Sequence, residues 1–347
     1  MTETILPIFG TAASAMAKMV LLCTAGAVLV RRGIIGENVL QPLSRLTIAL
    51  FLPSLLATKL GENVTVGQLR LWWLLPVSAV VYASVGFALG RVSRSLFCRT
   101  KGFERFYAAS CSQGNSGYLP MILVVTICEL TPEFKAIPNS KDIGLACVSL
   151  YLVGFVPTLW GCIFPYVSEH RIDRSLIPRI FNPPMVAVII GVSIGLIPPL
   201  KGLFWGGNAP LSIVADAADM LGDATIPCAM LILGGNLSKG VDGKAIDGMT
   251  VTGVAVCRLL LMPLFALLYV AFLRHTALLP NDPLVVLVLL ISPSTPTALN
   301  MVVISQAAGR QEKAVANLLF WIYTISLVTL TCFVTVFLYL IFHSPAS

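Results

Sequence analysis

The sequence predicts an all-α polytopic membrane protein: ten transmembrane helices in a five-plus-five inverted repeat, with broken fourth and ninth helices that cross. Three observations predict this class. The chain is 57% hydrophobic and 11% charged, whereas about a quarter of a soluble domain is charged. Ten apolar segments have roughly the 20 residues that cross a bilayer. Two of them are interrupted by glycines, prolines and amides, and the interruptions lie half a chain apart.

The ten segments are separated by short loops, which leave no room for a soluble domain of any size. The first segment is too long for the core of a signal peptide, so we expect it to be retained. The expected spans cover residues 5–30, 39–57, 71–92, 103–130, 143–167, 184–200, 211–237, 250–273, 284–308 and 315–342.

The positive charges of the loops predict the orientation of the chain. In and beside the loops after spans 1, 3, 5, 7 and 9 we count 14 Lys and Arg residues, against 6 for the other loops. Loops rich in Lys and Arg stay in the cytosol, so we expect both termini on the lumenal or extracellular side. We interpret the distribution of the net charge of +7 as a sign of topology, and no nucleic-acid partner is expected.

Equal spacings in the two halves predict the repeat. Pro53 and Pro227 are 174 residues apart, and Pro120 and Pro293 are 173 apart, close to half of the 347 residues. An odd number of spans in each half makes the two halves enter the membrane in opposite directions. The expected division is a first repeat at 1–167, a short cytosolic linker at 168–181 and a second repeat at 182–347.

The two interrupted spans predict a binding site. One contains GNSGYLP at 114–120, and the other contains SPSTPTALN at 292–300. Freed backbone groups at membrane depth are tolerated where they line a cavity, and paired breaks point to the binding site of a secondary transporter. Half-helices that begin there direct N–H groups and positive dipole ends at the crossing, which stabilises anions. Neither break contains Asp or Glu, so we expect a small organic carboxylate.

The substrate-binding residues that these breaks predict are Gln113, Gly114, Asn115, Ser116, Tyr118, Pro120, Ser294, Pro296, Thr297 and Asn300. The alternative interpretation is a pair of proline kinks in which Ser, Thr and Asn side chains satisfy one another. The three histidines are scattered and show no metal-ligand spacing. We therefore expect no metal, no cofactor and no catalytic residue.

Ionisable residues within spans are candidates for function. Lys18 and Asp223 are candidates for charge or proton coupling. Lys18 would neutralise a substrate carboxylate or pair with an Asp of span seven, and a purely structural ion pair fits equally well. Asp223 would carry a proton or cap the next helical turn, and capping is slightly favoured. The role of Arg258 stays undecided, and Tyr323 is interpreted as a packing residue.

An enzyme, a channel and a receptor are the alternatives to a carrier. Asp216, Asp219 and Asp223 form a DxxDxxxD pattern, the spacing with which intramembrane prenyltransferases hold magnesium diphosphate, and Asp suits Mg²⁺. That chemistry needs a second aspartate cluster, which the sequence does not supply with the same spacing, so an enzyme is not expected. A channel or a receptor built on the same fold stays an alternative.

Long strings of residues carry a family resemblance. The second half contains NPPMVAVIIGVSIGLIPPLKGLFWGGNAPL, LGDATIPCAMLILGGNLSKG and PTALNMVVISQAAG, and the fourth span contains GNSG followed by Pro120. These strings resemble the auxin efflux carrier family, and within it the PIN-likes branch. The resemblance implies crossed fourth and ninth spans and a division into a scaffold part and a moving transport part.

The resemblance also implies a carrier of indole-3-acetic acid (auxin) or a related aromatic carboxylate. It implies that the protein lies in the endoplasmic reticulum membrane, with the plasma membrane as the alternative. We expect membrane lipid around the protein, and a homodimer stays an open alternative to a monomer. Asn115 and Asn300 match amide positions of the family's two breaks. Tyr118 stands where an asparagine is usual, and Thr297 replaces a proline, so we expect a pocket of changed shape and polarity.

Overall fold

The computed structural model describes residues 2–169, 171, 173–207, 209–238 and 245–343. The regular structure of these residues is helical, apart from one isolated β-bridge. The first half contains α1 (Thr2–Arg31), α2 (Glu37–Leu46), η1 (Thr47–Phe51), α3 (Leu52–Asn63), α4 (Val66–Trp72), α5 (Leu74–Phe97), α6 (Glu104–Ser112), α7 (Tyr118–Leu130), α8 (Pro132–Lys135), α9 (Ser140–Pro157), η2 (Thr158–Ile163) and α10 (Phe164–Ser168).

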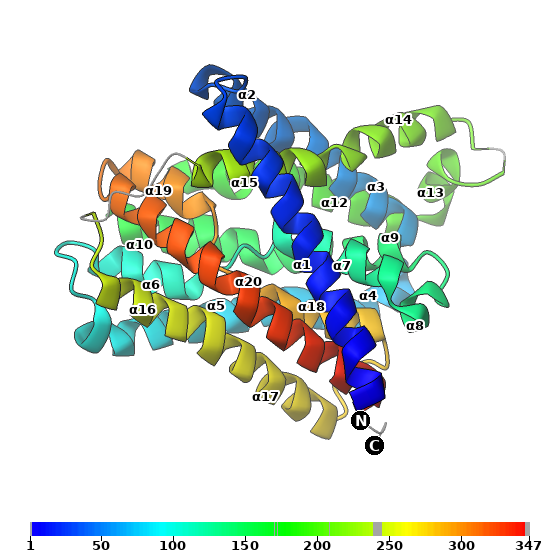
Figure 1. Cartoon of the computed structure of the whole chain (residues 1–347). Helices are drawn as coiled ribbons and strands as arrows, with labels where there is room; N and C mark the ends of the chain where they lie inside the picture. The colour runs from blue at the N-terminus through cyan, green and yellow to red at the C-terminus, as the bar shows by residue number, and fades with distance from the viewer. Residues whose placement is uncertain (1, 170, 172, 208, 239–244, 344–347) are drawn as a thin grey trace.

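The second half contains η3 (Arg174–Leu176), α11 (Ile177–Ile180), α12 (Pro183–Leu196), α13 (Pro198–Phe204), α14 (Ser212–Asp223), α15 (Thr225–Leu237), α16 (Gly248–Ala255), η4 (Val256–Leu261), α17 (Met262–His275), α18 (Pro283–Ser294), α19 (Asn300–Ala308) and α20 (Glu312–His343). In Figure 1, α8 lies at the right of the molecule, and α6, α10 and α19 lie at the left.

The all-α membrane class is confirmed. Seven stretches of described helix are long and apolar enough to cross a membrane, and an eighth qualifies if η3–α11 and α12, bent by 65°, form one span. The shorter apolar helices α7 and α18 belong to the two interrupted spans, whose breaks make each piece too short to qualify alone. The count of ten spans and the inverted repeat stay predictions.

Three spans contain a turn of π-helix directly before a proline. The segments η1, η2 and η4 end two residues before Pro53, Pro165 and Pro263. A proline inside a helix has no N–H to donate, and its ring crowds the carbonyl four residues earlier. A locally widened turn relieves that crowding. The widened turn η4 also contains Arg258.

Two sets of helix contacts are called helix groups here, and the two groups also pack against each other through α3 and α9 and through α1 and α7. One group joins α1 to α15, and α3 to α12 and α14. The other joins α5 to α6 and α9, α7 to α9, and α17 to α18. In the first group α1 and α15 approach closely, since a Cβ on Gly234 would lie 1.8 Å from the carbonyl oxygen of Cys23. Small residues commonly permit such backbone contact between membrane helices.

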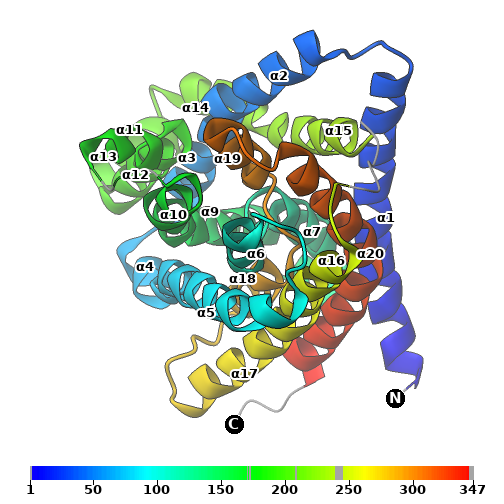
Figure 2. The ribbon, with the colours of Figure 1, turned by 90° about the vertical axis from the view of Figure 1, so that its left-hand side faces the viewer.

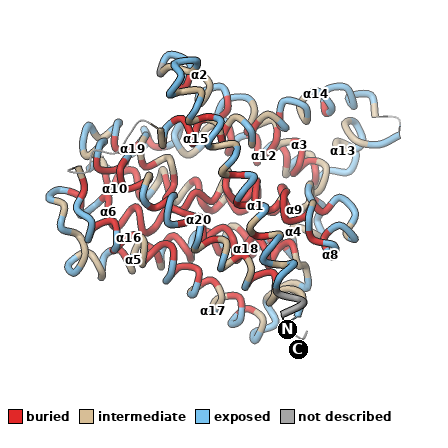
Figure 3. Tube along the Cα trace, viewed as in Figure 1, coloured by how far each residue is buried: buried red, intermediate tan, exposed pale blue. Residues whose placement is uncertain are grey.

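The broken helices lie at the centre of the molecule. Viewed as in Figure 2, α6, α7 and α18 are surrounded by the other helices, and every residue from Leu284 to Ser294 is buried. The outer surface carries exposed apolar side chains, such as Leu21, Ile213 and Met220. Exposed stretches lie along the outer helices, α14 among them (Figure 3). Such a surface suits contact with lipid, and the interrupted backbone is shielded from that lipid, as a membrane protein requires.

Candidate functional site

The two breaks cross and bond to each other. Gly114 and Thr297 form an isolated antiparallel β-bridge. The backbone N–H of Asn115 donates to the carbonyl oxygen of Pro296 at 2.7 Å, and that of Ala298 donates to Gln113 at 2.9 Å. The predicted crossing of the fourth and ninth spans is therefore confirmed. These two bonds satisfy backbone groups that the breaks would otherwise leave without a partner.

Polar side chains of the two breaks form hydrogen bonds with neighbouring helices. Asn115 Nδ2 donates to the hydroxyl of Tyr323 on α20 at 2.8 Å. Ser116 Oγ donates to the carbonyl oxygen of Ser292 at 3.1 Å, and Thr297 Oγ1 donates to Ser110 at 3.0 Å. The Ser and Thr side chains of both breaks thus donate to backbone carbonyls, and the alternative interpretation stays open.

A buried arginine lies against the crossing. Arg258 is 2% exposed, and its Nε donates to the carbonyl oxygen of Thr295 at 2.8 Å. Its Nη1 lies 3.4 Å from the carbonyl oxygen of Ser112. A Cβ added to Gly114 would come within 1.6 Å of Nη2. A larger residue at position 114 would therefore displace the guanidinium behind it, which is a reason for glycine that the sequence alone does not show.

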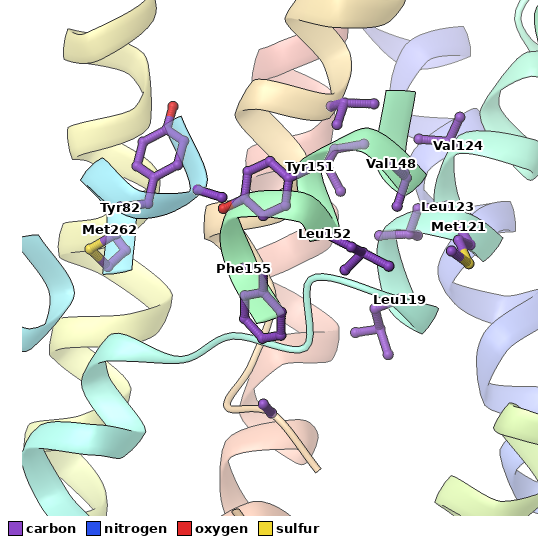
Figure 4. Close-up of a cluster of buried hydrophobic side chains, with 14 of the residues drawn as sticks. Tyr82, Leu119, Met121, Leu123, Val124, Val148, Tyr151, Leu152, Phe155 and Met262 are labelled. Atoms are coloured by element: carbon purple, nitrogen blue, oxygen red, sulfur yellow. The ribbon is translucent and has the colours of Figure 1, made fainter. Parts of the chain in front are cut away.

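A cavity of about 110 Å³ opens beside the crossing. Its walls come from both breaks, from span 2, from span 5 and from the start of α12. Figure 4 shows Tyr151, Leu152 and Phe155 on α9, beside the chain that joins α6 to α7. The lining residues are Ile48, Leu52, Gly114, Asn115, Ser116, Gly117, Tyr118, Leu152, Phe155, Val156, Leu159, Trp160, Asn182, Pro184, Ala298, Leu299 and Asn300.

The predicted site residues separate into two sets. Those that line the cavity are Gly114, Asn115, Ser116, Tyr118 and Asn300. Those that do not line it are Gln113, Pro120, Ser294, Pro296 and Thr297. The second set builds the crossing instead: Gln113 and Pro296 supply backbone carbonyls, and Thr297 bonds to α6. Pro120 lies within α7, and Ser294 is the last residue of α18.

Several residues of the site have no signal in the sequence. Phe155 and Trp160 come from a continuous span, and Asn182 comes from the start of α12, where its side chain also accepts the N–H of Met185. Tyr323, interpreted from sequence as packing, holds the Asn115 amide. Position in a regular apolar helix does not distinguish these residues from ordinary core, so only tertiary contact identifies them.

The first coupling candidate forms an ion pair away from the crossing. Lys18 Nζ lies 3.1 Å from Glu129 Oε2 on α7. Of the roles left open for Lys18, pairing with an Asp of span seven is not seen, and an ion pair with α7 is present instead. It is Lys59 that pairs with span seven, at 2.7 Å from Asp219, and it also lies 2.9 Å from Asp142 on α9.

The second coupling candidate, Asp223, is the exposed last residue of α14. The helix α15 that follows has no side-chain cap, so the capping role is not seen.

A third lysine contacts the same helix as Lys59. Lys201 of α13 donates from Nζ to the carbonyl oxygen of Glu62 on α3. Burial lowers the pKa of the Lys201 ammonium, and the charge of Glu62 opposes that shift.

The aspartates of the prenyltransferase alternative all lie on α14. Asp219 is held by Lys59 and by the hydroxyl of Thr58, while Asp216 and Asp223 are exposed. In the described part of the chain, no three His, Cys, Asp or Glu residues are grouped so that they could hold a metal ion.

Comparison with known proteins gives one consistent result. A family described as "Membrane transport protein" matches residues 11–175 and 170–334. Protein PIN-LIKES 1 of Arabidopsis thaliana is 26% identical over 97% of this chain and 81% of its own length. Protein PIN-LIKES 3 of the same plant is 24% identical over 97% and 99%. An uncharacterized transporter of Schizosaccharomyces pombe is 20% identical over 89% and 90%.

Proposed function

This chain belongs to the membrane transport protein family, the auxin efflux carrier family that its sequence resembles, and from that premise we propose that it carries a small aromatic carboxylate across its membrane. Indole-3-acetate or a close relative is the proposed substrate. The observation that carries the proposal is the cavity at the crossing, where Asn115 and Asn300 from the two breaks meet aromatic side chains of α9 and η2.

The chemistry of the cavity supports an aromatic acid. Phe155, Trp160 and Tyr118 offer flat apolar surface to a ring. The amide of Asn300 forms no hydrogen bond with any residue that the structure describes, so it is free to bind a carboxylate. The backbone N–H groups at the starts of α7 and α19 lie in the same wall and stabilise an anion.

The size of the cavity supports movement during transport. Its 110 Å³ is well below the roughly 300–1,000 Å³ of ordinary ligand sites. An aromatic acid therefore requires the walls to separate, and these walls belong to both helix groups: span 2 and α12 on one side, the breaks and α9 on the other. We propose alternating access in which one helix group moves past the other around the crossing.

The charge pattern of the loops supports a proposed orientation. The cavity reaches Asn182, at the end of the Arg-rich linker, and so opens toward the proposed cytosolic side. The start of α1 and the end of α20 lie at the opposite side (Figure 1). We propose both termini in the lumen of the endoplasmic reticulum, with the plasma membrane as the alternative.

Transport in proteoliposomes tests the function. We expect saturable uptake of at least one labelled aromatic carboxylate from a panel, measured with and without a pH gradient. Flux that rises without saturation would indicate a channel, and binding without flux would indicate a receptor. Uptake of cations alone would contradict the proposed substrate class.

Two ion pairs join the helix groups on the side away from the cavity. Lys59 of α3 holds Asp142 of α9, and Lys18 of α1 holds Glu129 of α7. The side chain of Lys59 is 8% exposed, so water screens this pair less than a surface pair. We propose that these contacts hold the lumenal side closed in the conformation described here.

Removing Lys59 is expected to shift the balance between conformations. Lys59→Met should lower the apparent affinity for substrate presented on the cavity side by up to about tenfold, because the closed lumenal side loses its contact. Transport affinity measured from each face of sealed vesicles checks this. Arg310→Met is the control, since Arg310 forms an ion pair with Glu169, at 3.0 Å, that shares no residue with the two pairs proposed to close the lumenal side. Equal effects of both variants would rule out a specific role for Lys59.

A further inference from the structure

Helix dipoles alone do not make the crossing positive. Four half-helices meet there: α7 and α19 begin at the crossing, whereas α6 and α18 end at it. Each N-terminus carries about +0.5 of an elementary charge and each C-terminus about −0.5, so the four ends cancel. A crossing that selects anions therefore needs a further positive charge.

Arg258 supplies a positive charge at the two negative ends. Its Nε donates to the carbonyl oxygen of Thr295, which directly follows α18, and its Nη1 faces the carbonyl oxygen of Ser112, the last residue of α6. In other secondary transporters such C-terminal ends help to hold the coupling cation. Here a fixed guanidinium occupies that place and offsets both ends. The positive starts of α7 and α19 are then left uncompensated beside the cavity.

The guanidinium has no counter-ion within the described chain. Arg258 is 2% exposed, and it forms no ion pair with any carboxylate of the residues that the structure covers. Burying an unpaired charge is costly, which favours a functional reason for it. Nη2 forms no hydrogen bond with a described residue and lies where a Cβ of Gly114 would be. Because Gly114 also lines the cavity, one glycine separates the charge from a bound ligand.

We propose that Arg258 is the residue that makes the crossing select anions, with the carboxylate of the ligand acting as its counter-ion across Gly114. The inference rests on the proposed function, because it concerns the charge of the molecule that is carried. Arg258 is in this respect a specificity-determining residue that acts through its field. A purely structural arginine, holding two carbonyls in place, would affect charged and uncharged ligands alike.

Three ligands with one ring and different charges test the proposal. Indole-3-acetate is negative, indole-3-acetamide is neutral and tryptamine is positive. Binding of each ligand to the purified full-length protein is measured by displacement of a labelled aromatic carboxylate and by the ligand-induced shift in Tm. We expect the wild-type protein to prefer the carboxylate. Arg258→Gln should reduce the preference for the carboxylate over the amide by about tenfold, with little change in amide binding.

Two further variants control the experiment. Arg258→Lys keeps the charge and should keep the preference for the carboxylate. Arg45→Gln makes the same substitution at an exposed arginine and should leave the preference unchanged. If Arg258→Gln does not fold, the wild-type protein and Arg258→Lys test the proposal instead. A wild-type protein or an Arg258→Lys variant that does not prefer the carboxylate over the amide overturns the proposal.

The remaining outcomes separate this inference from the proposed function. Equal losses of carboxylate and amide binding in Arg258→Gln, or an unchanged preference, overturn the inference while transport stands. A charge preference that depends on Arg258 without any transport overturns the proposed function alone. A wild-type protein that binds none of the three ligands overturns both.

Discussion

Replacing Gly114 by alanine is expected to destabilise the protein at its crossing. The new Cβ would lie 1.6 Å from Arg258 Nη2 and 2.7 Å from Thr295 Oγ1, so the guanidinium must leave its two carbonyl partners. A hydrogen bond of a charged group contributes about 1.5–3 kcal/mol, so losing both would remove a large part of the stability of most proteins. The yield of monodisperse protein after detergent extraction, and its Tm, measure the effect.

Gly117→Ala is the matched control for this prediction. The same methyl group is added in the same break, but the nearest atom that a Cβ would meet is Leu152 Cδ2 at 3.8 Å, an ordinary contact distance. We expect this variant to accumulate normally and to lose less than about 1 kcal/mol, as substitutions without a named structural conflict usually do. If Gly114→Ala is as stable as Gly117→Ala, Arg258 does not lie where the structure places it.

A negative charge at position 115 is expected to abolish substrate binding. Asn115 is buried at the meeting point of both breaks and lines the cavity. A hydrogen bond from its amide to a carboxylate is worth about 1.5–3 kcal/mol, so Asn115→Ala should weaken binding about 10-fold to 100-fold. Asn115→Asp should be worse, because it opposes the ligand with a like charge at low dielectric. Equilibrium binding of the aromatic carboxylate measures both.

Tyr323→Phe separates the ligand contact from the packing contact at this position. It removes the Asn115–Tyr323 hydrogen bond but keeps the amide, so we expect a smaller loss of binding than for Asn115→Ala. Equal losses in both variants would mean that the amide serves only to hold α20. Unimpaired binding by Asn115→Asp would show that the carboxylate binds away from the crossing.

The sequence indicated the breaks because their composition conflicts with their surroundings. Glycine, proline and amide residues inside apolar segments leave backbone groups that lipid cannot satisfy, and the structure accordingly ends α6 at Ser112 and α18 at Ser294. Asn115 and Asn300 were predicted by the same reasoning, and both line the cavity. Hydropathy also located the seven spans that qualify in the described structure to within about six residues, because helix length must match the bilayer.

Other features of the site depend on three-dimensional information. Pro296 and Thr297 were expected in the pocket, yet they face the partner break, because the crossing turns only one side of each extended segment toward the cavity. An Asp of span seven was one predicted partner of Lys18, whereas the structure pairs Lys18 with Glu129 on α7. Which charged side chains form ion pairs depends on how the helices pack, and residue spacing alone does not predict that packing.

The sequence by itself determined the membrane class, the places where two spans break and the amides at those places, since each follows from the length and polarity of local segments. The tertiary structure decided the rest. It brought Phe155 and Trp160 from regular helix into the cavity wall and set the Arg258 guanidinium behind Gly114. The physical reason is that the free-energy cost of a backbone N–H or C=O without a partner depends on the segment that contains it, so the sequence of that segment is enough to predict the break. The guanidinium that contacts the ends of α6 and α18 comes from a distant span that reaches them only in the packed protein.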